Sequence, residues 1–78
     1  MNAIETAYTH SDSVIGRKNR ALAAITDRVT DRERNPAEGE AARFIQNSII
    51  ASWEEIAYKN GASDFEVERA NIEGLQDA

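Results

Sequence analysis

The residues that could do chemistry are few, and their spacing does not suit catalysis. His10 is followed by Ser11, Asp12 and Ser13, which are the residue types of a base, a nucleophile and an orienting carboxylate. A catalytic set of this kind must converge from separate rigid elements beside donors for an oxyanion, whereas these residues are neighbours in one segment. We therefore predict that His10 is a turn residue.

The carboxylates form no catalytic or metal-binding pattern either. Glu54 and Glu55 are adjacent, so on a helix they point about 100° apart and cannot act as a carboxylate pair. Asp27, Asp31 and Glu33 lack the glycine turn and the ligand spacing of a calcium loop. The four glycines form no phosphate-binding motif. We expect no enzymatic activity, no metal and no cofactor.

Length and composition limit what the chain can be. Its 78 residues suffice for one domain, which buries only about 60% of the surface of the unfolded chain. There is no cysteine, so neither a disulfide nor a thiolate zinc site can supplement the small core, and association with another chain is the remaining common device. Because we see no membrane-spanning run and no signal peptide, we expect a cytoplasmic protein.

Capping signals divide the chain into helices. Asn35-Pro36-Ala37-Glu38 combines an N-cap residue, a proline suited to the first helical position and a glutamate that can bond back to the cap. Asn60-Gly61 is typical of a helix end, and Ser63-Asp64-Phe65-Glu66 is a second capping box. The pattern predicts one all-α domain over residues 1–78, with helices at about 3–8, 12–34, 36–60 and 64–75.

The first segment carries an apolar seam with the spacing of a heptad repeat. Cap-like residues at 9–12 interrupt this seam, which favours a short helix, a break and a long helix, and a single continuous helix is the alternative. We expect an antiparallel αα-hairpin in which the seam packs on the 36–60 helix. The seam positions, with Ser11 and Lys18 filling the gaps, are Ile4, Tyr8, Ile15, Leu22, Ile25 and Val29.

The 36–60 helix has two apolar lines. The predicted core stripe consists of Ala42, Ile45, Ile49, Trp53 and Ile56, and Ile50 and Ala57 widen it on one side. On the opposite face, Phe44, Ala51 and Tyr58 follow one another at intervals of seven. The third helix could cover this second line with its own apolar residues Phe65, Ile72 and Leu75. Scattered exposed aromatics, a homodimer seam and a site for a different protein are the other interpretations.

The net charge of −5 is unevenly distributed. Residues 17–34 carry six cations and three acids, whereas residues 35–78 carry three cations and nine acids. An acidic surface can steer a basic partner, and the acids that we assign to such a site are Glu54, Glu55, Glu66, Glu68 and Glu73. If the basic segment instead contacts phosphates, the residues to do so are Arg17, Lys18, Arg20 and Arg28.

These patterns favour a non-enzymatic protein-binding module, an inhibitor or adaptor that occupies a basic surface of a partner protein. We expect it to form a homodimeric helical bundle. A nucleic-acid-associated regulator and a structural homo-oligomer are the alternatives. In its general properties, though not in any sequence motif, the chain resembles small accessory proteins of phages and mobile elements, including anti-defence inhibitors. Such proteins are often short, acidic and free of cysteine, and this resemblance assigns a role to no residue.

Overall fold

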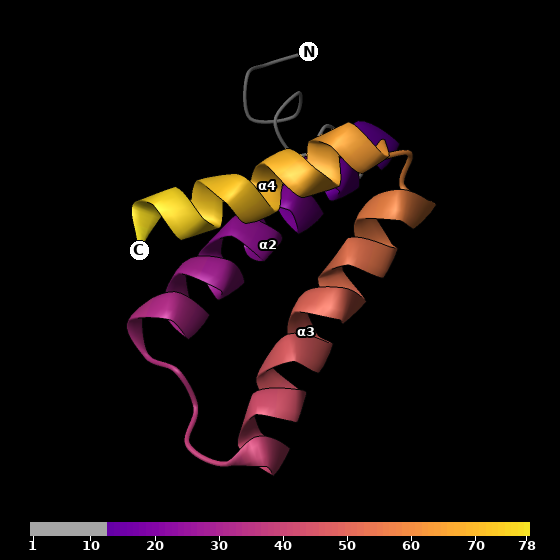
Figure 1. Ribbon diagram of the computed structural model, residues 1–78. Coiled ribbons are helices and arrows are strands. Elements are labelled where there is room, and N and C mark those ends of the chain that lie inside the picture. Colours follow the sequence, from indigo (N-terminus) through magenta and orange to yellow (C-terminus); the bar gives the residue numbers. More distant parts are fainter. Residues whose placement is uncertain (1–12) are drawn as a thin grey trace, which may run out of the picture.

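The computed structural model describes residues 13–78, which form three helices and no strand (Figure 1). The helices are α2 (Val14–Arg34), α3 (Glu40–Lys59) and α4 (Asp64–Asp77). The all-helical prediction is therefore confirmed for this part of the chain. The helix predicted at residues 3–8, the break expected near residues 9–12 and the turn at His10 lie outside the described residues.

α2 is the central helix, because both other helices pack on it. α3 runs antiparallel to α2, as in the expected hairpin. Near the start of α2, the side chain of Arg17 donates to that of Asn60, and near its end the side chain of Arg32 donates to that of Asn47. α4 returns parallel to α2 and lies along it, so that α2 separates much of α4 from α3 (Figure 1).

α2 and α4 approach closely where Gly74 lacks a side chain. The hydroxyl of Thr26 donates to the carbonyl of Ala70 at 2.9 Å, and the hydroxyl of Thr30 lies 3.0 Å from the carbonyl of Gly74. Both contacts join a side chain of α2 to the backbone of α4. A Cβ atom on Gly74 would lie 2.6 Å from the Cβ of Val29 and 2.8 Å from the carbonyl oxygen of Thr26. The helices therefore meet at a distance that only glycine permits.

The fully buried core is built from small and medium-sized apolar side chains. Three helices contribute to it, and Leu22, Trp53 and Ala62 pack against it while keeping part of their surface exposed. Within residues 13–78, no aromatic side chain is fully buried. The buried residues are Ala21, Ile25, Val29, Ile50, Ala57, Val67 and Ala70.

The buried face of α3 is displaced by about one residue from the centre of the predicted core stripe. Ile45, Ile49 and Ile56 are exposed, and the buried residues are Ile50 and Ala57, which the sequence places at one edge of the stripe. One residue corresponds to a rotation of about 100° around the helix axis. Because apolar residues occupy several faces of α3, their periodicity admits more than one core face, and the contact with α2 selects between them.

The other two residues of the predicted stripe, Ala42 and Trp53, are partly buried. Trp53 packs against the core and lines a shallow groove between α2 and α3, which we call the α2–α3 groove. Its indole is flanked there by charged side chains of α2. The residues that line the groove are Ala24, Asp27, Arg28, Asp31 and Trp53.

α3 begins four residues later than predicted, at Glu40. Gly39 precedes it with φ of 90°, a left-handed conformation from which the helix cannot continue backwards. Asn35 is the C-cap of α2 rather than an N-cap of α3, so the capping box predicted here is not formed. The side-chain amide of Gln46 instead holds the segment between α2 and α3. It donates to the carbonyl of Asn35 and accepts from the backbone N–H of Ala37.

The end of α3 and the start of α4 follow the prediction. Gly61 has φ of 91°, and the N–H of Ala62 donates to the carbonyl of Ala57, which satisfies a carbonyl at the end of α3. The capping box at the start of α4 is confirmed: the hydroxyl of Ser63 accepts from the N–H of Glu66, and the carboxylate of Glu66 accepts from the N–H of Ser63. Local sequence thus fixes this corner of the fold.

Candidate protein-binding surfaces

The most exposed large apolar side chains within residues 13–78 are two phenylalanines. Phe44 of α3 is 72% exposed and Phe65 of α4 is 70% exposed. Phenylalanine normally contributes strongly to a core, and a single exposed one would need no explanation. Here each belongs to a line of exposed apolar residues along its helix, and these two lines are the candidate binding surfaces.

The first surface lies on α3, on the side away from α2. Phe44, Ala51 and Tyr58 are all exposed, at intervals of seven residues. We call this side of the helix the α3 outer face, and it also includes Ile45, Ser48 and Ser52. The interpretation in which the third helix folds over the Phe44–Tyr58 line is wrong, because α4 packs along α2 instead.

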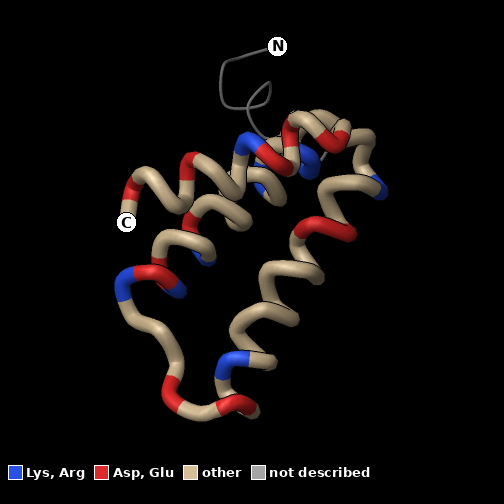
Figure 2. The backbone as a smooth tube through the Cα atoms, in the orientation of Figure 1, with Lys and Arg blue, Asp and Glu red and all other residues tan. Residues whose placement is uncertain are grey.

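The α3 outer face is uncharged over most of its length. Between Arg43 and Glu54 no residue of the helix carries a charge, and Figure 2 shows this as an uninterrupted tan stretch in α3. Only Ile50 is fully buried in that stretch. A solvent-exposed helix of a monomer usually carries charged residues on its outer side, so the lack of charge here favours contact with another molecule.

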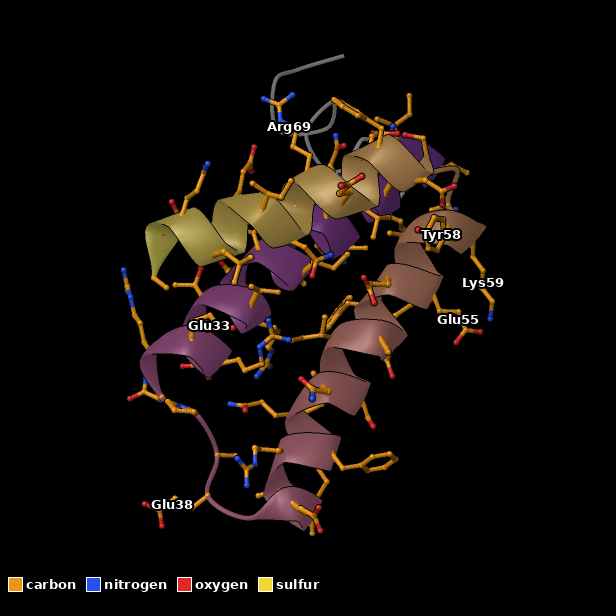
Figure 3. All side chains as sticks on the ribbon, viewed as in Figure 1. Glu33, Glu38, Glu55, Tyr58, Lys59 and Arg69 are labelled. Atoms are coloured by element: carbon orange, nitrogen blue, oxygen red, sulfur yellow. The ribbon has the colours of Figure 1, made fainter. Side chains whose placement is uncertain are left out.

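Tyr58 ends the line close to α4. Its hydroxyl is hydrogen-bonded to the carboxylate of Asp64, and this bond, followed by partial burial and the negative charges of Asp64 and Glu54, raises the pKa of Tyr58 above its ordinary value. One turn away on α3, Glu55 and Lys59 form an i,i+4 ion pair at 3.1 Å. Figure 3 shows both of these side chains pointing away from α2.

The second surface is the outer side of α4. Val67, Ala70 and Gly74 form the buried side of this helix, so its other apolar residues are left outside. We call this side the α4 outer face, and a shallow hollow in it is lined by Phe65, Glu68, Arg69 and Ile72. The members of the face are Phe65, Glu68, Ile72 and Leu75, of which the three apolar ones are all exposed.

The five acids assigned to a partner site do not share one face. Glu66 and Glu73 line a groove between α2 and α4, whereas Glu68 lies in the hollow of the α4 outer face. Glu54 accepts from the side chain of Asn71 at 3.1 Å, across the gap between α3 and α4. Glu55 belongs to the ion pair on α3.

Most of these acids have partners within the described chain. Glu73 pairs with Arg69 at 3.1 Å and Glu66 pairs with Lys18 at 3.0 Å. The hydrogen bond from the backbone of Ser63, and then the contact with Lys18, hold the pKa of Glu66 below its ordinary value. Of the five, Glu68 is the acid best placed to meet a new partner.

The basic residues considered for phosphate contact are also dispersed. Lys18 faces α4 through its ion pair with Glu66, and Arg17 faces α3 through a hydrogen bond. Arg28 lines the α2–α3 groove beside two aspartates, and Arg20 is exposed on α2. The four side chains therefore form no continuous positive stripe.

Sequence reasoning noticed the apolar residues of α4 but assigned them to intramolecular packing. The sequence does contain a pattern that indicates which side of α4 is buried. Val67, Ala70 and Gly74 share one face of this helix at spacings of three and four. Small residues on one face favour close packing against a neighbouring helix, which leaves the larger residues for the outer side.

No protein-family model, curated protein or solved structure matches this chain. Among residues 13–78, no group of three histidine, cysteine, aspartate or glutamate side chains is arranged to hold a metal ion. No helix in that part of the chain is both long and apolar enough to cross a membrane.

Proposed function

We propose that the protein is a small acidic binding module, an inhibitor or adaptor that presents the α4 outer face to a partner protein. The observation that carries this proposal is the exposure of Phe65, Ile72 and Leu75 on one side of a helix whose opposite side already forms the core. Their exposed fractions are 70%, 45% and 51%. Rows of exposed apolar residues with polar residues around them are typical of protein-binding sites.

The charge of α4 supports a partner with basic groups. The helix carries five acids and one arginine, and its acids are spread along its length in Figure 2. Glu68 lies in the hollow between Phe65 and Ile72, where it is placed to meet a lysine or arginine. We therefore propose a partner segment that inserts an apolar side chain beside Phe65 and a cation beside Glu68.

The nucleic-acid alternative has less support. Phosphate binding requires cations that are gathered and available, and here Lys18 is paired with Glu66 while Arg17 bonds α3. Cytoplasmic location is part of the protein-binding proposal. Dimerisation into a helical bundle is a separate proposal, which rests on α3 rather than on α4.

Affinity capture from the host, followed by mass spectrometry, tests the binding proposal. We expect a partner retained by the wild-type chain to be lost with Phe65→Glu and to be kept with Phe44→Glu, which makes the same substitution at an equally exposed phenylalanine on α3. Because Phe65 is exposed near the helix N-terminus, its replacement by glutamate should leave the fold intact. A partner that binds all three chains equally would contradict the assignment to the α4 outer face.

The charge of the site needs a second variant. Glu68→Lys should weaken binding of the captured partner at least tenfold and reduce the dependence of its affinity on salt. Glu55→Lys provides the matched control, because Glu55 is also exposed but lies on α3. Equal affinity of wild-type and Glu68→Lys would show that this acid only keeps the surface soluble.

A further inference from the structure

We propose that the α3 outer face binds a second copy of the same chain in antiparallel orientation. The line Phe44–Ala51–Tyr58 reads aromatic, small, aromatic at equal intervals, so it has the same pattern in both directions. An interface with twofold symmetry must be complementary to itself. A helix face with this pattern meets that condition when the two helices run in opposite directions.

The spacing sets the register. Phe44 and Tyr58 each lie seven residues from Ala51, which is about 10 Å along the helix axis. With the twofold axis at Ala51, Phe44 of one copy comes level with Tyr58 of the other, and the two Ala51 residues face each other. The small side chains of Ser48 and Ser52, beside this axis, allow the two helices to approach closely.

The charges on α3 favour a second copy in this orientation. In a parallel pair, Glu55 would lie beside the other Glu55 and Lys59 beside the other Lys59. In the antiparallel pair, the two Glu55 residues are displaced by about 12 Å along the axis, which exceeds the Debye length of about 8–10 Å at moderate salt. Lys59 comes level with Arg43 of the other copy and within one turn of its Glu40, so it meets one like and one opposite charge. The Arg43 side chain bonds the carbonyl of Gly39.

The uncharged stretch between Arg43 and Glu54 then forms the centre of the interface. A partner protein with a strongly charged surface would gain no charge pairing there, whereas a second copy brings an equally uncharged face.

The apolar area available for this interface is modest. For an aromatic side chain of about 150–250 Å², the exposed fractions of 72% for Phe44 and 45% for Tyr58 leave roughly 180–290 Å² to bury.

That area is about a quarter to a third of the roughly 800 Å² that each partner buries in a standard interface. Ile45, which is 60% exposed on the same face, must therefore join the contact. An interface of this size lies below the standard range and belongs with weak, transient contacts, so we expect dimerisation to depend on concentration, with a Kd weaker than about 10 μM. The α4 outer face belongs to another helix, so the dimer and the partner-binding site are tested independently.

Mass measurement across concentration is the first experiment. Sedimentation equilibrium should show a shift from one chain of 8.6 kDa towards two as the concentration rises. Ala51→Glu places two like charges at the axis and should raise Kd at least tenfold, and an equimolar mixture of Ala51→Glu with Ala51→Lys should restore the dimer. Gln76→Glu is the control, because it adds a negative charge on α4 and should leave Kd unchanged.

Cross-linking then tests the orientation. The natural chain has no cysteine, so single-cysteine variants give one readout each. With a short thiol-reactive cross-linker, a mixture of Ser48→Cys and Glu55→Cys should yield mainly the mixed product in the antiparallel dimer. Products that join two identical variants would indicate a parallel pair and overturn the proposed register. A single-chain mass at every concentration up to about 1 mM, with circular dichroism showing a folded chain, would overturn the dimer itself.

Discussion

Replacing Gly74 by alanine tests the close contact between α2 and α4. On an exposed helix this change would stabilise the chain by about 1 kcal/mol, because glycine is the weaker helix former. At Gly74 the added Cβ would lie 2.6 Å from the Cβ of Val29 and 2.8 Å from the carbonyl oxygen of Thr26. Neither atom belongs to the free end of a flexible side chain, so the helices must move apart.

The magnitude follows from three contributions. Overpacking of a core typically costs about 1–3 kcal/mol. Separation of the helices also weakens the hydrogen bond from the hydroxyl of Thr26 to the backbone of α4, worth about 0.5–1.5 kcal/mol. The contact of the Thr30 hydroxyl with α4 contributes less, because its one proton is shared with the carbonyl of Thr26. After the gain of about 1 kcal/mol in helix propensity, we expect Gly74→Ala to lower the free energy of unfolding by about 2 kcal/mol. For a chain of this length, Tm should fall by about 8–16 °C.

Thermal and urea unfolding followed by circular dichroism at 222 nm provide the measurement. A matched double mutant separates crowding from other causes. Val29→Ala removes the Cγ1 atom, which lies 2.8 Å from the added Cβ, so the pair Val29→Ala and Gly74→Ala should cost less than the sum of the single changes. A Gly74→Ala chain as stable as the wild type, or more stable, would refute the close approach of α2 and α4.

Two further predictions concern the core and the capping box. Ile25→Ala should destabilise the chain by about 2–5 kcal/mol and by more than Trp53→Ala, because Ile25 is fully buried whereas Trp53 is only partly buried. The urea midpoints of the two variants measure this order. A larger loss of stability in Trp53→Ala would mean that Trp53 anchors the core. Because the pKa of Glu66 is lowered by the backbone of Ser63 and by Lys18, its contribution to stability is complete above the ordinary value near 4.5 and is lost as the pH falls through the lowered value. The Tm of the wild type should therefore fall more steeply below pH 4.5 than that of Glu66→Gln, and parallel curves of Tm against pH would contradict this role.

Much of the local structure could be predicted from the sequence because it depends on residues close together in the chain. The capping box of Ser63 and Glu66 and the left-handed Gly61 are examples, since each needs only its neighbours. The start of α3 was predicted wrongly at residues 35–38. The deciding contact there is made by Gln46, a turn and a half into the helix, and local capping preferences do not include it.

The candidate surfaces depend on contacts that the sequence does not reveal. The periodicity of α3 fitted a core face at Ile45 and Ile49 as well as the observed one at Ile50, and only the position of α2 distinguishes them. The sequence allows an exposed Phe44 as one of several arrangements. Phe65 is exposed because α4 packs on α2 through the side of the helix that carries Gly74, which leaves Phe65 on the outer side. This contact joins residues more than 40 positions apart, and no local motif predicts it.

The position of Trp53 gives this protein an internal reporter. It is the single tryptophan of the chain and lies between α2 and α3, next to Asp27 and Asp31 and away from both outer faces. Its fluorescence should therefore follow the separation of α2 from α3 and respond little to events on α4. Comparison of indole emission with helical ellipticity during unfolding would show whether α4 detaches before the hairpin opens, so the order of disassembly can be read without adding a label.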